Sequence, residues 1–201
     1  WELRSRARVH TSSSVLCWAA CDRLAKIATH LGLDQRGALW RDRADQVRGK
    51  ILDRAWNPEL ASFAESFDGD DLDAGLLLMS EVGFLHPTDE RFASTVSAME
   101  KVLRRGDHLM RYVAADDLGR PQNAFNICTF WYIEVLVGLG RIDEAREIFG
   151  RMLESRNHLG LLSEDIDPTN GELWGNFPQT YSLVGVINVA MQLSEGWETI
   201  L

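Results

Sequence analysis

Residues 123–154 read NAFNICTFWYIEVLVGLGRIDEAREIFGRMLE, and this stretch places two kinds of helix one after the other. Residues 123–138 are apolar nearly all round, which predicts a helix that is buried on every side. Residues 142–154 carry apolar side chains at helical spacing with charges between them, which predicts an amphipathic helix with one solvent face. The stretch therefore indicates inner helices that alternate with outer ones.

The same alternation extends through the rest of the chain. Residues 11–31, 35–55 and 87–103 predict further helices with apolar residues at helical spacing, and residues 72–81 and 177–193 predict helices that are apolar nearly all round. Strand-like alternation is absent, although residues 62–66 and 110–113 could pair locally as short extended pieces. The sequence predicts an all-α fold of helical hairpins arranged as an inner and an outer ring.

A solenoid is the alternative helical architecture. Residues 140–149, GRIDEAREIF, resemble one unit of a tetratricopeptide-type repeat. A second copy about 34 residues away is missing, and the loops between helices differ too much in length for a regular array. The absence of repetition favours the ring.

The composition limits the class of partner. With 201 residues and 45% hydrophobic content, the chain is one domain or a large piece of one. The net charge of −9 and the lack of a basic block argue against nucleic acid and anionic membranes as partners, and no apolar run predicts a membrane span. A neutral ligand such as a sugar fits this balance. Because the chain opens at Trp1 without Met, we expect it to be part of a longer protein.

Cys17, Cys21 and Cys128 form an odd set, and the first two have the spacing of one helical turn rather than that of a good disulfide. The simplest interpretation is a reducing, cytoplasmic setting in which the three are small packing residues. A metal site at the Cys pair lacks further ligands at suitable spacing, so neither a metal nor another cofactor is expected.

The motif with the most chemistry is GLLSEDID at residues 160–167, which is followed by GNFPQTY at residues 175–181. It sets acids beside aromatic and amide side chains, as a sugar-cleaving site requires for proton transfer, ring stacking and hydroxyl recognition. The candidate residues are Glu164, Trp174, Gln179 and Tyr181, although aromatic residues near a helix start are more often core. Residues 165–169 begin like a calcium loop, but Asn170 stands where such a loop needs glycine.

Several motifs in this order resemble glycoside hydrolase family 15, which contains glucoamylase, glucodextranase and trehalase-like enzymes. They are Trp1-Glu2, the run from His10 to Ala19, Leu72-Asp73-Ala74, Arg111-Tyr112, Ala124-Phe125, Cys128-Thr129-Phe130-Trp131, Leu161-Leu162-Ser163-Glu164 and Gly175-Asn176-Phe177-Pro178-Gln179. The resemblance covers essentially the whole chain. It implies an (α/α)6 barrel, of which residues 1–201 would be the C-terminal half of one catalytic domain, with the upstream half and any N-terminal β domain absent.

The resemblance also implies roles for individual residues. Glu2 would be the general acid and Glu164 the general base of an inverting hydrolase, with Trp1, Arg111 and Tyr112 at the sugar. From composition alone, Glu2 reads as a solvated terminal carboxylate, and Arg111 reads equally well as half of an ion pair with Asp116 or Asp117. The implied substrate is an α-glucan or α-glucoside, a neutral oligosaccharide or disaccharide from which glucose is released.

Two consequences can be checked. Glu164 must stay ionised, which Asp165 and Asp167 would oppose unless they point outward or meet cations such as Arg4 or Arg111. About seven helices cannot close a six-hairpin barrel, so uncovered apolar faces and self-association are expected. The alternative function is a noncatalytic helical scaffold or carbohydrate-binding remnant that keeps the architecture without a competent site.

Overall fold

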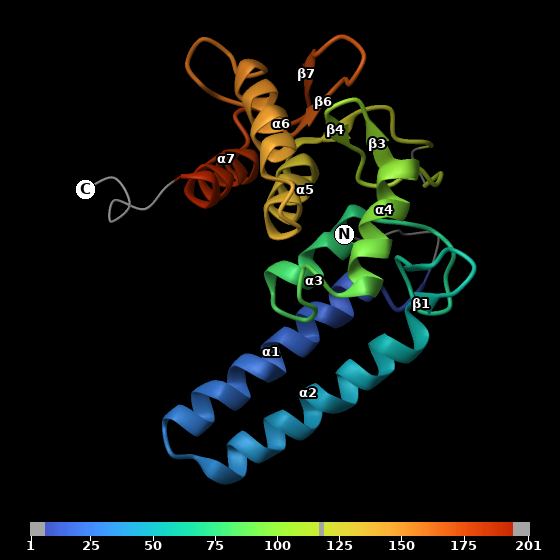
Figure 1. The fold of residues 1–201 in the computed structure, drawn as a ribbon, viewed down its shortest axis with the longest axis vertical. Coiled ribbons are helices and arrows are strands. Elements are labelled where there is room, and N and C mark those ends of the chain that lie inside the picture. Colours follow the sequence, from blue (N-terminus) through green and yellow to red (C-terminus); the bar gives the residue numbers. More distant parts are fainter. Residues whose placement is uncertain (1–6, 117–118, 195–201) are drawn as a thin grey trace. The chain divides into compact units, whose positions relative to one another are not determined.

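The computed structural model describes residues 7–116 and 119–194. They belong to two compact units: the first holds residues 7–99 with residue 116, and the second holds residues 100–115 and 119–194. Helices dominate both units, with only two-residue strands between them, so the all-α class is confirmed (Figure 1).

The first unit is built on a hairpin of two long helices, α1 (Thr11–His30) and α2 (Asp34–Arg54) (Figure 1). Side chains that recur every three or four residues on α1 are buried, as an amphipathic helix requires: Val15, Trp18, Asp22, Ala25 and Ala28. After the hairpin come the strand pair β1 (Trp56–Asn57) and β2 (Ser62–Phe63), the 3-10 turn η1 (Ala74–Leu77), α3 (Leu78–Glu81) and the first part of α4 (Glu90–Leu103).

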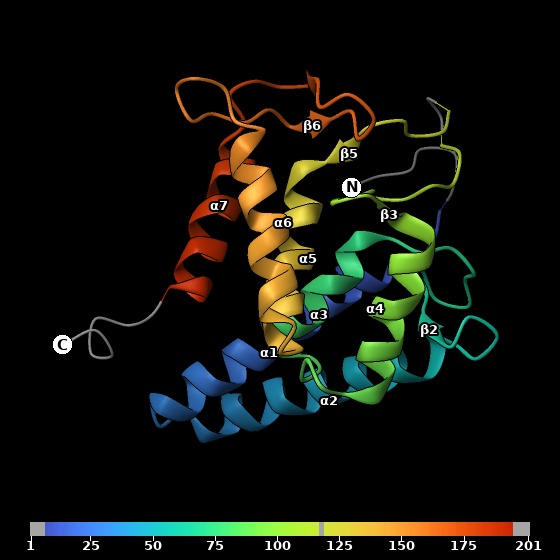
Figure 2. The ribbon, with the colours of Figure 1, turned by 45° about the horizontal axis from the view of Figure 1, so that its top comes forward.

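The second unit combines three helices with two small sheets. The helices are α5 (Asn126–Gly138), α6 (Ile142–Glu154) and α7 (Thr180–Leu193). Strands β3 (Arg104–Arg105) and β4 (His108–Leu109) pair with each other, and a three-stranded antiparallel sheet has the order β5 (Ala124–Phe125), β6 (Asp165–Ile166), β7 (Leu173–Trp174). This sheet lies at one end of the three helices, where α5 and α7 begin (Figure 2).

Helix α5 is the core of the second unit, because most of its side chains are buried, and it contacts both α6 and α7. The contact with α7 is close enough to require glycine, since a Cβ at Gly185 would lie 2.6 Å from Cδ2 of Phe130. Helix α6 buries one narrow face, as its amphipathic pattern predicts, through Ala145, Ile148 and Met152.

The predicted segments do form helices, but some of these helices begin or end at other residues than predicted. Residues 124–125 pair as strand β5 and residue 126 opens α5, so the helix begins three residues later than predicted. Residues 72–81 form a 3-10 turn and one turn of α-helix rather than a continuous helix, because Asp73 caps Gly75 and starts the turn there.

The prediction that residues 177–193 are buried all round is wrong for one face of α7. Val184, Ile187 and Met191 are exposed there, the last with 71% of its surface accessible. An apolar sequence alone does not predict which face of a helix packs against another element. Self-association through this uncovered face stays a prediction.

The local strand predictions are half right. Residues 62–63 pair with 56–57, but the extended piece expected at 110–113 lies two residues earlier, at His108–Leu109. Among the described residues, no helix is both long enough and apolar enough to cross a membrane.

Candidate functional site

The acidic loop before β6 is fixed by hydrogen bonds to the ends of α5 and α7. At its start, Leu162 O accepts from the backbone of Gln179. Ser163 O accepts from the Asn126 side chain at 2.9 Å and from the Ser182 hydroxyl at 2.8 Å. Backbone bonds on both sides of the loop leave little freedom for Glu164, the next residue.

Glu164 itself is half-buried, and its main chain is bonded in both directions. Its carbonyl accepts from the backbone N–H of Asn126, and its own N–H donates to Asn176 O, each at 2.9 Å. Oε2 of its side chain accepts from the backbone N–H of Asn176 at 3.1 Å and from Nδ2 of Asn176 at 2.8 Å. No side chain among the described residues of the second unit bonds Oε1, so this oxygen is left for a ligand or water.

The two neighbouring aspartates behave differently from each other. Burial, and then the nearby charge of Glu164, raises the pKa of Asp165 to about 6. Asp167 turns into its own loop instead, where hydrogen bonds from Thr169 hold the pKa of this carboxyl below its usual value. Ion pairing by Arg or Lys is absent at both Glu164 and Asp165 among the second unit's described residues, so the expected help from cations is not seen there.

Three aromatic residues near Asn176 in the sequence have about half of their surfaces exposed. Trp174 and Phe177 are each 50% exposed, and they lie two residues before and one residue after Asn176. Tyr181 is 46% exposed and packs edge-on against Phe125 and Trp131, with ring centroids 6.5 and 5.9 Å apart. Half-exposed aromatic rings, such as that of Tyr181 packed against two other rings, are suited to stacking on a sugar.

The remaining predicted residues differ in how closely they approach the loop. Gln179 is partly buried at the start of α7, and its backbone is bonded to the loop. Arg111 and Tyr112 are also partly buried, in the segment after β4, and β4 in turn contacts β5 of the site sheet. Trp1 and Glu2 lie outside the described residues, so the structure does not address the proposed acid.

Metal ligation has no support at the described positions. Among residues 7–116 and 119–194, no group of three His, Cys, Asp or Glu side chains could hold an ion. The packing interpretation suits Cys128, which is buried, but is wrong for Cys17, which is exposed.

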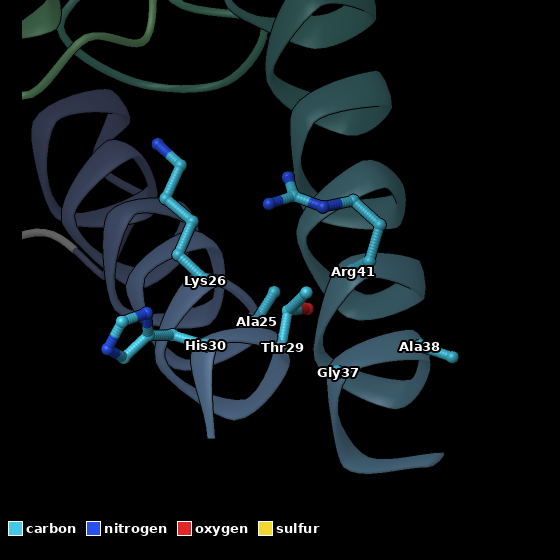
Figure 3. Close-up of a pocket in the computed structure, with 7 residues that line it drawn as sticks. All are labelled: Ala25, Lys26, Thr29, His30, Gly37, Ala38 and Arg41. Carbon is cyan, nitrogen blue, oxygen red and sulfur yellow. The ribbon is translucent and has the colours of Figure 1, made fainter. Parts of the chain in front are cut away.

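A concavity lies in the first unit, between α1 and α2, with a volume of about 530 Å³ (Figure 3). It is lined by Ala25, Lys26, Thr29, His30, Gly37, Ala38 and Arg41. Lys26 and Arg41 converge on the buried carboxylate of Asp22 at 2.8 and 2.9 Å. Its lining holds no Trp, Phe or Tyr ring for stacking on a sugar and no Asp or Glu side chain for proton transfer, so it lacks the combination of groups found around Glu164.

Comparison with known sequences decides the family. The family model for glycosyl hydrolases family 15 matches residues 1–191. The chain belongs to this family.

Curated relatives from this family are trehalases. The chain is 38% identical to the trehalase of Thermoplasma volcanium over 196 residues, which are 97% of this chain and 32% of that protein. It is 34% identical to the trehalase of Mycobacterium tuberculosis, with 96% of this chain and 29% of that protein covered. The chain thus spans about a third of the length of the curated relatives it matches.

Solved structures agree on the fold. A structure titled "Glycosidase Wild Type" superposes with a TM-score of 0.78 at 15% identity, covering 92% of this chain and 52% of that one. The glucoamylase from Saccharomycopsis fibuligera superposes with a TM-score of 0.72 at 12% identity, covering 92% of this chain and 55% of that one. The family 15 chain therefore has part of an (α/α)6 toroid, as its sequence predicts.

The sequence prediction missed two features of this family 15 site. Asn176 was read as part of an amide-rich turn, whereas it provides both hydrogen bonds to the carboxylate of Glu164. Asn126, read only as part of a helix, secures the loop from α5 with its side chain and its backbone. The sequence offered one signal for the role of Asn176. The Gly175-Asn176 pair often marks a turn or a bulge, where the backbone changes direction.

Proposed function

We propose that this chain is the C-terminal portion of the catalytic domain of an inverting α-glucoside hydrolase and that Glu164 is the general base. One observation carries the proposal: Oε2 of Glu164 is held by Asn176 while Oε1 has no protein partner among the second unit's described residues. Half-exposed aromatic residues follow in the same hairpin and at the start of α7. Membership of family 15 and the trehalase relatives support the same reaction class.

The chemistry needs two carboxyl groups on opposite sides of the scissile bond. Oε1 of Glu164 takes a proton from a water molecule, whose oxygen attacks the anomeric carbon of the glucosyl residue. The bond from that carbon to the glycosidic oxygen breaks, and the leaving oxygen receives the proton of the acid, which we assign to Glu2. Attack from the opposite face inverts the anomeric centre, so the first product is β-glucose, and no cofactor is required.

The surrounding side chains would bind the sugar. Trp174, Phe177 and Tyr181 offer ring faces for stacking. Arg111, Tyr112, Gln179 and Trp1 are the proposed donors and contacts for the glucose hydroxyls.

The proposed substrate is a small neutral α-glucoside, for which the net charge of −9 creates no attraction or repulsion. Because the curated relatives are trehalases, trehalose is the first substrate to test, with maltose as the α-glucan representative. An exposed thiol at Cys17 in a set of three cysteines supports a reducing, cytoplasmic setting.

The test is Glu164→Gln in the whole protein that carries this chain. Glu172→Gln in the same hairpin is the control, because Glu172 is exposed and its side chain makes no hydrogen bond or ion pair with the described residues. We expect kcat on the better of the two glucosides to fall about a thousandfold for Glu164→Gln and to stay unchanged for the control. Proton NMR of the first turnovers should show β-glucose. Wild-type turnover in Glu164→Gln would assign the base to another residue, absence of glucose release by the wild-type protein would favour the noncatalytic scaffold, and α-glucose as the first product would exclude inversion.

A further inference from the structure

We propose that Asn176 is the positioning residue for Glu164: it fixes one oxygen of the carboxylate so that the other faces the attacking water. This inference rests on the proposed function, because it assumes that Glu164 is the general base. Asn176 would act through Glu164 and need not touch the substrate.

The evidence begins with the number of bonds between two residues that are twelve positions apart. Glu164 N–H donates to Asn176 O at 2.9 Å, and Asn176 returns two bonds to the Glu164 side chain, at 3.1 Å from its backbone and 2.8 Å from Nδ2. Both returned bonds converge on Oε2. Because an ionised carboxylate only accepts, the Asn176 amide must present its NH2 group here, and Oε1 is left without a donor from either residue.

The hairpin explains why Asn176 lies at this position. Strands β6 and β7 pair Asp165 with Trp174 and Ile166 with Leu173, so a regular continuation would place Gly175 opposite Glu164. Glu164 bonds instead to Asn176, one residue further on, which makes Gly175 an extra residue of the bulge type. Such an insertion turns the following side chain, and here it directs the amide of Asn176 toward the carboxylate.

Gly175 also leaves room for the carboxylate. Its φ of +79° is in the left-handed region, and a Cβ added there would lie 3.0 Å from both Cβ and Oε2 of Glu164. The close approach of backbone and carboxylate therefore depends on two neighbouring residues, one that provides donors and one that provides space.

An amide suits a general base better than a cation would. A hydrogen bond from Asn176 fixes the direction of the carboxylate without neutralising its charge, whereas an arginine would reduce its ability to take a proton. The titratable or charged groups on the surrounding elements are Asp165, Asp167 and Glu172 of the hairpin, Tyr181 of α7, and Arg111 and Tyr112 after β4. Asp165 is the adjacent acid, so donors at Oε2 also oppose the effect of a like charge on ionisation.

Two variants of the whole protein test this role. Asn176→Ala removes the side-chain donor and retains the backbone donor, so we expect kcat to fall about 10- to 100-fold with KM little changed. The acidic limb of the pH–activity profile should move to higher pH, because the ionised base loses a donor. Asn176→Asp has nearly the same shape, but it cannot donate when ionised; its loss should exceed that of Asn176→Ala at pH 7 and shrink on acidification, when the new carboxyl gains a proton to donate.

Asn170→Ala is the matched control, since Asn170 lies in the same hairpin and its side chain bonds Glu172 N–H and Asp167 of its own loop rather than Glu164. Wild-type kcat and an unchanged pH profile in both Asn176 variants would overturn the inference, as would a loss of activity that only follows a loss of folded protein. The near-isosteric Asp variant keeps the test decisive if the Ala variant folds poorly. Wild-type turnover in Glu164→Gln would refute the proposed function itself, whereas an inactive Glu164→Gln together with fully active Asn176 variants would refute this inference alone.

Discussion

Glu144 on α6 and Glu164 before β6 belong to the same unit, but opposite kinds of partner hold them. Glu144 bonds two arginines, Arg104 at 2.8 Å and Arg141 at 2.6 Å, and Arg141 also bonds Glu100. Glu164 is held by the neutral groups of one asparagine and keeps one oxygen for other use. The Glu144 carboxylate, which joins α6 to β3, is paired with two cations, whereas Glu164, the proposed base, is fixed in direction by neutral donors at one oxygen.

The difference extends to the neighbours of each group. Burial works against ionisation of Glu144, but the hydrogen bonds from the two arginines outweigh it and hold the pKa of this carboxyl below its usual value. Tyr132 completes that cluster by donating its hydroxyl to Glu100 and accepting from Arg104. The acid next to Glu164 has the opposite shift, since the pKa of Asp165 is raised to about 6 by burial and by Glu164. The cluster around Glu144 stabilises the fold, whereas next to Glu164 lies Asp165, whose ionisation is disfavoured by burial.

Among the variants that test the contrast between Glu144 and Glu164, the largest effect on kcat is expected from moving Glu164 without changing its chemistry. Gly175→Ala would place a methyl group 3.0 Å from both Cβ and Oε2 of Glu164, so the carboxylate must shift by a few tenths of an ångström. Because a displacement of about 1 Å at a reacting group costs about 100-fold, we expect kcat to fall about tenfold. Gly171→Ala is the matched control, because Gly171 has a similar φ of +76° and nothing within 4 Å of its added Cβ. Steady-state kinetics on both variants should show the loss in the first alone, although both lose some stability. Equal kinetics would mean that the close approach at Gly175 has no part in positioning.

The second prediction concerns the cluster that should affect stability alone. Glu144→Gln leaves Arg104 and Arg141 without their carboxylate, and because these side chains are about one-third exposed we expect a loss of about 2 kcal/mol in the free energy of unfolding at pH 7. The pKa of Glu144 is lowered in the folded state, so its contribution is present above pH 4.5 and disappears as the pH falls through its folded value. Urea unfolding at several pH values measures this, with kcat expected to be unchanged.

Glu147→Gln on the same helix is the control for that variant, because Glu147 is 63% exposed and its solvent-screened ion pair with Arg151 should contribute little to stability. A large loss of kcat in Glu144→Gln would remove the distinction between the two groups of acids.

These two regions also show how far the sequence alone can predict. Helix α6 and the fully apolar α5 were predictable from periodicity, and the acid loop was found from its residue types. The partners of Glu164 were not, because the bulge at Gly175 shifts the register by one residue, and such a shift depends on backbone geometry rather than on composition. Nor could the sequence distinguish Asp165 from Asp167, which have the same side chain in different degrees of burial.

The smallest predicted effect is a gain in stability at Asp165. Its folded pKa of about 6 is above the ordinary value of 3.8, so between those pH values the unfolded chain loses this proton while the folded chain retains it. Stability therefore falls as the pH rises through this window and stays lower above it. Asp165→Asn removes the penalty, and after allowance for solvent screening the variant should be about 1 kcal/mol more stable than wild type at pH 7 and equal to it below about pH 4.

Asp167→Asn gives the contrast, because the pKa of Asp167 is lowered by its own turn and its contribution has the opposite sign. We expect Asp167→Asn to be less stable than wild type at pH 7 and the difference to shrink toward pH 3. The same urea titrations measure both. If Asp165→Asn were less stable than wild type at pH 7, the acid beside the candidate base would be a stabilising group like Glu144. The contrast between the arginine-paired Glu144 and the acids near Asn176 would then depend on Glu164 alone.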